Sequence, residues 1–294
     1  MAFVVTSATL MARHQAAYGQ EAESTARAWQ LIDGRSWQIV SRPGDTEDTA
    51  TTDKAQGTRG ACPPGMVDVR GAMKRNGARS VESLQDASCT EWIPNSSPGR
   101  CAQFDAAHWL AQARELSTID LHFCIDRFEY PDQRGAYPVV AVTFDEAEAT
   151  CSKNRARLCT EDEWTFACEG ENALPYPYGY QRDDRACVID RQWMAFDAAQ
   201  LSPRAGPGAM QELDKLWQGE ASGARPACRS PFGVYDLTGN VDEWTRSTQP
   251  GRRSILKGGY WGPVRTRCRP STRAHGEDFF FYQQGFRCCA DIPT

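Results

Sequence analysis

The sequence predicts an α+β fold that is rich in loops and stabilised by disulfide bonds. Twelve cysteines are spread over 294 residues, which is typical of a domain cross-linked in an oxidising compartment. Twenty-four glycines and nine tryptophans favour an irregular structure over a helical bundle. Glycine recurs wherever a short apolar run ends between Pro231 and Cys289, as expected of turns that approach one another closely.

Charge and hydropathy exclude two broad classes of protein. The formal net charge is −5, so there is no general electrostatic attraction to nucleic acid. The mean hydropathy of −0.58 argues against an integral membrane body. We therefore expect a globular protein that binds no nucleic acid and whose ligand is a protein or a small molecule that the sequence does not identify.

The first sixty residues are expected to lie outside the main domain. Ala2–Met11 is largely apolar, but it is too short for a membrane span and no basic residue precedes it. We expect an export signal or membrane tether upstream of the chain's start, or a misplaced start; the alternative is a surface helix of a cytosolic protein. Apolar residues in 13–40 have weak helical spacing, so residues 1–40 form an N-terminal segment. Residues 41–60 contain almost nothing to bury and predict a flexible linker.

The folded domain is expected to span residues 61–294 and to open with a strand at 61–69. Cys89 and Cys101 flank a turn rich in Pro, Asn, Ser and Gly that a disulfide would close. Apolar residues at helical spacing then predict a helix over 105–116.

The middle of the domain combines a strand with two short helices. Residues 123–131 are rich in strand-forming residues and end at a proline. A Thr-x-x-Glu capping box precedes each of two expected helices, at 144–153 and 161–169. Cys151 and Cys168 share a helix face with an apolar residue one turn earlier, so both sulfur atoms are expected to point inward.

A series of motifs follows one another in a fixed order along the second half of the chain. They are Arg-Leu-Cys-Thr-Glu-Asp-Glu-Trp (157–164), Gly-Asn-Val-Asp-Glu-Trp (239–244), Gly-Gly-Tyr-Trp (258–261), Arg-Cys (267–268) and Gly-Phe-Arg-Cys (285–288). The set resembles the signature of the formylglycine-generating enzyme family, also called the sulfatase-modifying-factor fold. The resemblance covers roughly residues 61–291. It implies an elaborated C-type-lectin-like core with a few short antiparallel strands.

The family resemblance implies a copper oxidase only where two reactive cysteines are present. In the family they lie between Gly-Gly-x-Trp and the following Arg-Cys, and copper(I) prefers such soft thiolate ligands. Here the interval Tyr260–Arg267 contains no cysteine, and Cys268 matches one half of a structural disulfide. We therefore expect neither copper nor formylglycine synthesis.

A second branch of the family that this chain resembles consists of the mononuclear iron sulfoxide synthases. The resemblance to that branch would imply an iron site with the motif His-x3-His-x-Glu. The chain has four histidines, but His108 and His122 are fourteen residues apart and the motif is absent. The leading hypothesis is an exported family member without copper that acts as a binding or accessory module. The alternative is an oxidoreductase of the broader non-haem-iron branch, whose metal site the sequence does not identify.

The turn at 239–243 is a candidate calcium site. In relatives the Gly-Asn-x-x-Glu turn resembles a calcium site, which implies ligands at Asn240, Val241 and Glu243. Calcium takes six to eight hard oxygen ligands, and a turn flanked by glycine supplies several from its backbone. The alternative is a purely structural Asn in a left-handed turn. Both interpretations remain open at this point.

Seven basic residues and no acidic one lie between Gly251 and Arg273. One interpretation is an anion- or carboxylate-binding groove, because arginine recognises carboxylates in a planar, bidentate manner. This groove would be lined by Trp261, Arg265, Arg267, Arg269 and Arg273. In the other interpretation the arginines form ion pairs that brace the loops. The candidate partners are Asp242, Glu243, Glu277 and Asp278.

Aromatic residues offer a further candidate surface. Those that would line a carbohydrate or peptide groove include Tyr178, Tyr260, Phe279, Phe280 and Tyr282. In a fold with little regular structure such residues are more often part of the core. Burial in the core is the expectation for Trp164 and Trp244.

The cysteines predict both a set of bridges and a location. Proximity in sequence suggests the pairs Cys89–Cys101 and Cys187–Cys228. The family resemblance implies Cys151–Cys288 and Cys168–Cys268, although the adjacent Cys289 is able to replace Cys288. The partners of Cys62, Cys124, Cys159 and Cys289 stay open. Cysteine usage predicts that the protein is periplasmic, attached to the cell envelope or secreted.

Overall fold

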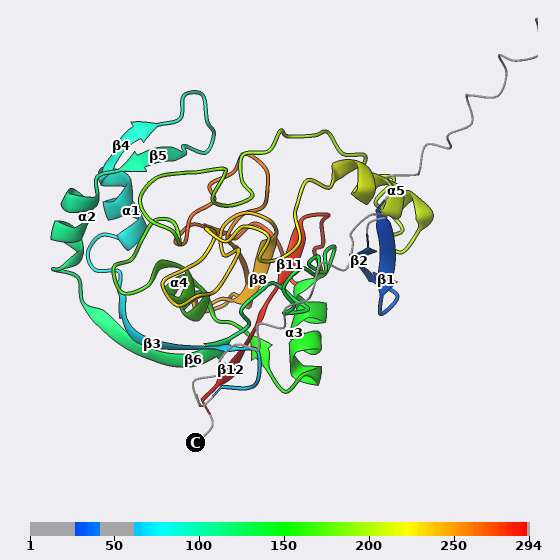
Figure 1. The fold of residues 1–294 in the computed structure, drawn as a ribbon, viewed down its shortest axis with the longest axis horizontal. Coiled ribbons are helices and arrows are strands. Elements are labelled where there is room, and N and C mark those ends of the chain that lie inside the picture. The colour runs from blue at the N-terminus through cyan, green and yellow to red at the C-terminus, as the bar shows by residue number, and fades with distance from the viewer. Residues whose placement is uncertain (1–26, 42–61, 293–294) are drawn as a thin grey trace, which may run out of the picture.

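Two four-stranded sheets form the centre of the protein (Figure 1). The computed structural model describes residues 27–41 and 62–292. The first sheet has the order β3 (Val67–Lys74), β6 (Thr118–Ile125), β12 (Cys288–Asp291), β7 (Arg157–Leu158). The second has the order β10 (Ser271–Thr272), β9 (Ser254–Lys257), β8 (Asp242–Arg246), β11 (Gln284–Phe286). All pairs are antiparallel except β8 with β11, which is parallel.

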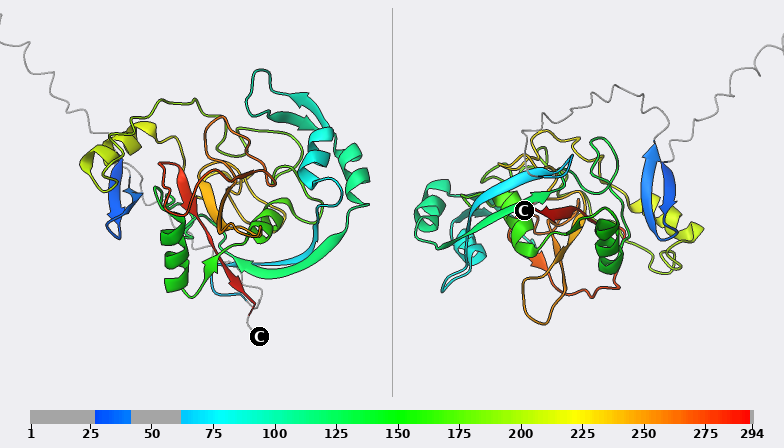
Figure 2. Two further views of the ribbon diagram at one scale, coloured as in Figure 1. Left: turned by 180° about the vertical axis from the view of Figure 1, so that it is seen from behind. Right: turned by 90° about the horizontal axis from the view of Figure 1, so that it is seen from below.

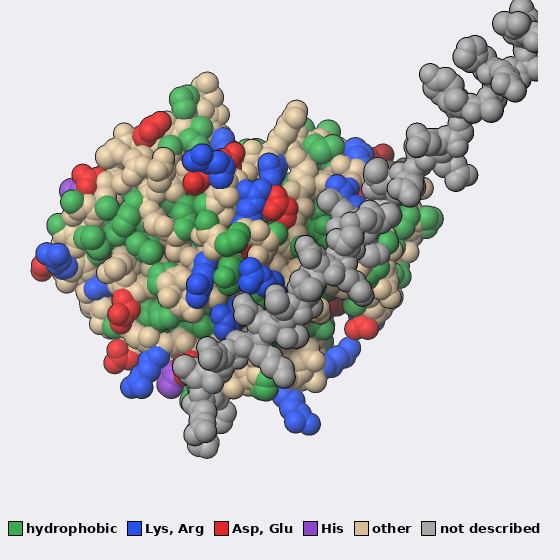
Figure 3. Space-filling view, in the orientation of Figure 1, with side chains coloured by type: hydrophobic (Ala, Val, Ile, Leu, Met, Phe, Trp, Pro, Cys, Tyr) green, Lys and Arg blue, Asp and Glu red, His purple; other side chains and the backbone are tan. Residues whose placement is uncertain are grey.

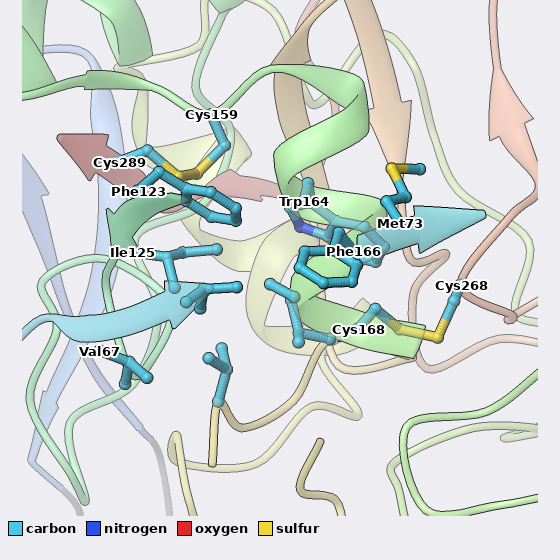
Figure 4. Close-up of a cluster of buried hydrophobic side chains, with 14 residues drawn as sticks. Val67, Met73, Phe123, Ile125, Cys159, Trp164, Phe166, Cys168, Cys268 and Cys289 are labelled. Atoms are coloured by element: carbon cyan, nitrogen blue, oxygen red, sulfur yellow. A yellow bond between two sulfur atoms is a disulfide. The ribbon is translucent and has the colours of Figure 1, made fainter. Parts of the chain in front are cut away.

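The helix α4 (Glu161–Glu169) packs against strands of both sheets. Every residue from Glu163 to Glu169 is buried, which is unusual for a helix of an α+β protein and reflects its central position. Trp164 and Phe166 meet Val69 and Phe123 of the first sheet in one hydrophobic cluster (Figure 4). The core therefore lies around α4, and α4 carries the first of the motifs singled out in the sequence.

The two capping boxes are confirmed. Thr143 precedes α3 (Phe144–Lys153), and its hydroxyl accepts from the backbone N–H of Glu146 while the Glu146 carboxylate accepts from the N–H of Thr143. Thr160 makes the same reciprocal pair before α4. The helix expected over 105–116 is α2 (Ala106–Ala113), whose first turn is capped by Asp105. Capping chemistry thus placed α3 and α4, and apolar spacing placed α2.

The remaining elements lie at the two ends of the molecule (Figures 1 and 2). One end contains the hairpin β1 (Ala28–Ile32) and β2 (Ser36–Ser41) together with α5 (Pro207–Leu216). The opposite end contains α1 (Val81–Ala87), β4 (Cys89–Trp92) and β5 (Cys101–Phe104) next to α2. None of the helices in the described ranges is long and apolar enough to span a bilayer.

Residues 13–40 have weak helical spacing in the sequence, but this prediction is wrong for residues 27–40. These residues form most of the β1–β2 hairpin. Asp33 and Gly34 form its turn with φ of 51° and 71°, because an Asp-Gly pair suits the positive φ values of a tight hairpin. Trp37 of the hairpin is buried and exchanges backbone hydrogen bonds with Val140. Of the linker expected at 41–60, Ser41 is the last residue of β2. Residues 1–26 and the rest of that linker, 42–60, lie outside the described residues.

The strand expected at 123–131 is displaced. The observed β6 runs from Thr118 to Ile125, and the chain turns directly after it. The turn is favoured by the Asp132 carboxylate, which accepts from the backbone N–H of Phe128. The Asp126 carboxylate accepts from the N–H of Cys288 and so connects the turn to β12. The short helix α1 precedes Cys89, in a part of the chain for which the sequence predicts no element.

Six disulfide bonds join all twelve cysteines. Four of them are the pairs named from the sequence: Cys89–Cys101, Cys151–Cys288, Cys168–Cys268 and Cys187–Cys228. The cysteines left open pair as Cys62–Cys124 and Cys159–Cys289. Adjacent cysteines on β12 therefore anchor two different bridges.

These two bridges act on almost the same loop. Once either has formed, the other closes a ring of only about nine residues, eight from Cys151 to Cys159 and one from Cys288 to Cys289. With Cys168–Cys268 intact, Cys151–Cys288 forming first closes a ring of 37 residues, 17 from Cys151 to Cys168 and 20 from Cys268 to Cys288. If Cys159–Cys289 forms first, the ring has 30 residues, 9 from Cys159 to Cys168 and 21 from Cys268 to Cys289. Each bridge is thus a partial substitute for the other.

Removing one of these bridges should therefore destabilise the protein much less than removing both. Alanine substitution of either pair should lower the free energy of unfolding by about 2.5 kcal/mol, the chain-entropy value for a ring of about nine residues. Removing both pairs also opens the larger ring and should cost about 6 kcal/mol. Urea denaturation of the three variants measures this difference.

The Cys89–Cys101 bridge provides the control, because it closes a separate 12-residue segment in the β4–β5 hairpin. Its removal should add to that of either β12 bridge without coupling. If the loss for both β12 bridges together merely doubles the loss for one, the proposed redundancy is wrong.

Candidate functional site

The Glu243 carboxylate of the Gly-Asn-Val-Asp-Glu turn forms a buried ion pair with Arg287 of the Gly-Phe-Arg-Cys motif. Nε and Nη2 of Arg287 donate to its two oxygens at 2.7 Å each, and both side chains are at most 1% exposed. The indole N–H of Trp164 donates to the same carboxylate at 2.7 Å. Arg287 also donates to the backbone carbonyls of Asp126 and Tyr235. Three of the sequence motifs thus meet at one charge pair.

Asn240 holds the preceding turn in a left-handed conformation, with φ of 54°. Its side-chain oxygen accepts from the N–H of Glu220 at 2.9 Å, and its side-chain nitrogen donates to Glu129 at 2.8 Å. The N–H of Val241 donates to the other oxygen of Glu129 at 3.3 Å. This arrangement corresponds to the second interpretation of the turn, a structural Asn.

The three ligands expected for calcium do not fit such an ion in this arrangement. The oxygens of Glu243 already face a guanidinium, and the oxygen of Asn240 is used by a backbone N–H. A divalent cation at Glu243 would also be repelled by Arg287. Across residues 27–41 and 62–292, no group of three or more His, Cys, Asp or Glu side chains is placed to hold a metal ion.

Further buried carboxyl groups surround the ion pair. Burial raises the pKa of Asp126 to about 8, and the pKa of Asp236 and of Asp242 to about 7. Burial also raises the pKa of Glu129 well above its usual value. Asp236 accepts from the N–H of Gly223 at 2.7 Å, so the group is held in place although it is desolvated. The carboxyl groups at the centre of the domain therefore outnumber the positive charge that the Arg287 guanidinium supplies there.

The arginines of the expected groove are paired with carboxylates of other elements. The pairs are Arg265–Glu82, Arg267–Asp86, Arg269–Glu169 and Arg273–Glu161. The ion-pair interpretation of the basic run is therefore correct, but its four candidate partners were wrong. Of those, Asp242 accepts from a backbone N–H, Glu243 pairs with Arg287 and Glu277 accepts from Ser254. The pairs connect the C-terminal loops to α1 and α4.

Trp261 does not form a wall of an arginine-lined groove. It is 1% exposed and packs against Trp217 and Tyr282, with ring centroids 4.9 and 5.9 Å apart. On the face drawn in Figure 3, basic and acidic side chains are interspersed and do not gather into a patch of one sign. The groove expected beside Trp261 is thus replaced by an aromatic cluster. Trp164 and Trp244 are in the core, as expected.

The run Phe279–Phe281 lines an open pocket of about 470 Å³. Leu201 and His275 also contribute to its walls, and the ring of His275 stacks on Phe279 with centroids 3.8 Å apart. Phe196 is 42% exposed and packs edge-on against Phe281. Exposed aromatic side chains around a pocket are a feature of ligand-binding surfaces. We call this region the aromatic pocket.

The loop that would carry reactive cysteines in a copper enzyme contains none in this chain. It runs from Gly262 to Arg267, between the buried Trp261 and Cys268, and Cys268 is bonded to Cys168 of α4. All other cysteines are also in disulfides. The oxidised chain therefore has no thiolate to offer to a soft metal ion.

Substituting Glu243 by Gln should destabilise the fold strongly. The change leaves the Arg287 guanidinium buried and unpaired, which typically costs about 3–5 kcal/mol. Urea denaturation at pH 7 measures the loss. Arg253→Gln is a matched control, because Arg253 pairs with Asp145 at the surface, where ion pairs contribute little to stability. Equal losses for the two variants would contradict the central role of the buried pair.

Stability should fall as the pH rises from 5 to 7. The native pKa values of Asp126, Asp236 and Asp242 lie above their unfolded value of 3.8, so the folded state binds more protons in this range. Each such group lowers the free energy of unfolding by roughly 1 kcal/mol per pH unit. The variant Asp236→Asn should reduce this slope by that amount, and the exposed Asp145→Asn should leave it unchanged. A slope that Asp236→Asn does not alter would refute the assignment.

Two curated proteins show what this chain is similar to in sequence. The mouse (Mus musculus) protein named inactive C-alpha-formylglycine-generating enzyme 2 is 32% identical over 167 residues, 52% of this chain and 49% of the relative. Hercynine oxygenase of Mycolicibacterium smegmatis is 30% identical over 146 residues, 47% of this chain and 34% of the relative. The chain thus spans half or less of these curated relatives.

The structure of PvdO from Pseudomonas aeruginosa aligns with a TM-score of 0.46 and 15% identity, over 79% of this chain and 95% of that one. Residues 115–292 match the model of the sulfatase-modifying factor enzyme 1-like domain. Since this match covers more than half of the 294 residues, the chain belongs to the FGE-sulfatase family.

Proposed function

We propose that this chain is an exported, non-catalytic member of the FGE-sulfatase family that acts as a binding or accessory domain. The observation that carries the proposal is the use of all twelve cysteines in disulfide bonds. Copper-dependent chemistry on thiolates needs free cysteines close together, and the loop 262–267 supplies none. The similarity to a mouse protein named inactive C-alpha-formylglycine-generating enzyme 2 also supports a non-catalytic role.

Export is supported by the same bridges. Six disulfides in one domain form and persist in oxidising compartments such as the periplasm, the cell surface or the extracellular space. Several of these cysteines lie in the core around α4, where a reduced thiol would lose the covalent connection between distant parts of the chain. A reducing compartment would therefore weaken the fold.

The aromatic pocket is the surface best suited to a ligand. It combines the rings of Phe279 and Phe281 with the exposed Phe196, which packs edge-on against Phe281. Large exposed aromatic side chains are costly in water unless a partner covers them. A sugar ring or an apolar peptide side chain would stack on such a surface.

An oxidoreductase of the non-haem-iron branch is the second candidate, favoured by the similarity to a hercynine oxygenase. It would require a metal site that the described residues do not assemble from His, Cys, Asp or Glu alone. Residues outside the described ranges, or a substrate that supplies ligands, would have to complete it. The two functions differ in metal content, which is a direct observable.

Metal content and peptide turnover together test the proposal. Protein purified from an oxidising compartment should contain iron and copper far below one atom per chain. A peptide with the sequence Cys-x-Pro-x-Arg should stay unmodified on mass spectrometry after incubation with or without copper, because no thiolate is present to activate it. Thiol titration of the unfolded, unreduced protein should detect almost no free thiol.

The outcomes separate the alternatives. Stoichiometric iron would favour the oxidoreductase, whereas conversion of the peptide to an aldehyde would mean that a reactive site lies elsewhere in the chain. Six or more free thiols per chain would overturn the assignment to an oxidising compartment.

A further inference from the structure

A second pocket, separate from the aromatic pocket, is enclosed by polar and charged side chains. It has a volume of about 520 Å³ and lies where β3, the start of α1, the first turn of α4 and the C-terminal loops meet. Its walls include the carboxylates of Glu161 and Asp162 and the guanidinium groups of Arg269 and Arg273. We call it the α4 pocket. Acidic and basic groups thus face the same small volume.

One of the carboxylates in this pocket has no partner among the described residues. Asp162 takes part in no hydrogen bond or ion pair there, whereas its neighbour Glu161 accepts from Ser271 at 3.0 Å and from Arg273 at 2.9 Å. Burial, and then Glu161, raise the pKa of Asp162, while Arg269 acts against this shift. A cationic hydrogen-bond donor placed at Asp162 would give this carboxylate a partner and would lower its pKa.

The two guanidinium groups at the wall of the α4 pocket each keep a donor that has no acceptor among the described residues. Arg269 has a side chain that is only 9% exposed, and its Nε and Nη2 are fixed by Glu169 and the carbonyl of Lys74. Its Nη1 has no acceptor among the described residues. Arg273 bonds Glu161 through Nη2, and its Nη1 likewise has no acceptor in the described ranges. Two donors of neighbouring arginines are suited to one carboxylate.

Other charges of the pocket are already balanced within the protein. Glu82 pairs with Arg265, and Arg269 pairs with the fully buried Glu169. A simple anion at the arginines would approach Asp162 and Glu161, and a simple cation at Asp162 would approach the arginines. Either ligand would meet repulsion that offsets part of its attraction. A small molecule with both charges meets a complementary group at each end.

We propose that the α4 pocket binds a free α-amino acid, with its ammonium group at Asp162 and its carboxylate at the Nη1 groups of Arg269 and Arg273. The inference goes beyond the proposed function, because it assigns a ligand class to a site distinct from the aromatic pocket. It does not depend on whether the domain is catalytic. Its failure would leave the metal and peptide tests unaffected.

The test is a binding titration of the purified, oxidised chain. Each of the twenty common L-amino acids is screened by saturation-transfer NMR, and those that bind are titrated by calorimetry. Sodium acetate and methylammonium chloride serve as probes with one charge only. We expect at least one amino acid to bind, and each single-charge probe to bind at least tenfold more weakly, because each satisfies one side of the pocket.

Two variants locate the binding site. Asp162→Asn and Arg273→Gln should each weaken binding of the amino acid at least tenfold. Both should fold, because Asp162 has no partner to lose and Arg273 is 40% exposed; thermal denaturation verifies this. Asp278→Asn, at the wall of the aromatic pocket, is the control and should leave the affinity unchanged.

Three results would overturn the proposal. In the first, none of the twenty amino acids binds. In the second, acetate or methylammonium binds as tightly as the amino acid, which would indicate a site for a single charge. In the third, Asp162→Asn and Arg273→Gln leave the affinity unchanged while Asp278→Asn lowers it, which would place the ligand in the aromatic pocket.

Discussion

The buried pair of Glu243 and Arg287 is the interaction on which the rest of the domain depends. It joins β8 to the residue between β11 and β12, and through Trp164 it also fixes α4. Strands of both central sheets and the central helix are thereby connected at one point. Because removing either charge would leave the other buried without its partner, this part of the structure has little freedom to rearrange. The carboxyl groups nearby are tolerated only because hydrogen bonds from backbone N–H groups hold them.

Those parts of the fold that depend on local chemistry were predictable from the sequence. Two capping boxes placed α3 and α4 because the cap is formed within four consecutive residues. The β1–β2 hairpin was missed although Asp33-Gly34 is a strong turn signal, because apolar residues near it also fitted a helical spacing. The helix α1 was missed because it is seven residues long and mostly polar. Its position depends on packing that no local pattern records.

The candidate sites were less predictable, for a physical reason. A run of arginines is visible in the sequence, but the acidic residue that each one selects lies far along the chain: Arg267 meets Asp86, 181 residues away. The sequence therefore indicated ion pairs without their partners. In the same way, the motif residue Glu243 suggested a calcium ligand, because nothing in the sequence showed that Arg287 would occupy its oxygens. The unpartnered Asp162 is recognisable only once every neighbouring charge has been assigned.

The network of disulfides also determines how the protein would respond to a protease. The exposed stretch around Trp193 lies between the two halves of four bridges: Cys151–Cys288, Cys159–Cys289, Cys168–Cys268 and Cys187–Cys228. A cut there would produce two polypeptides that remain one covalent molecule, with the core around α4 still held together. The nicked protein would separate into fragments only after reduction. In an extracellular setting such a domain survives cleavage of its surface loops as a two-chain protein.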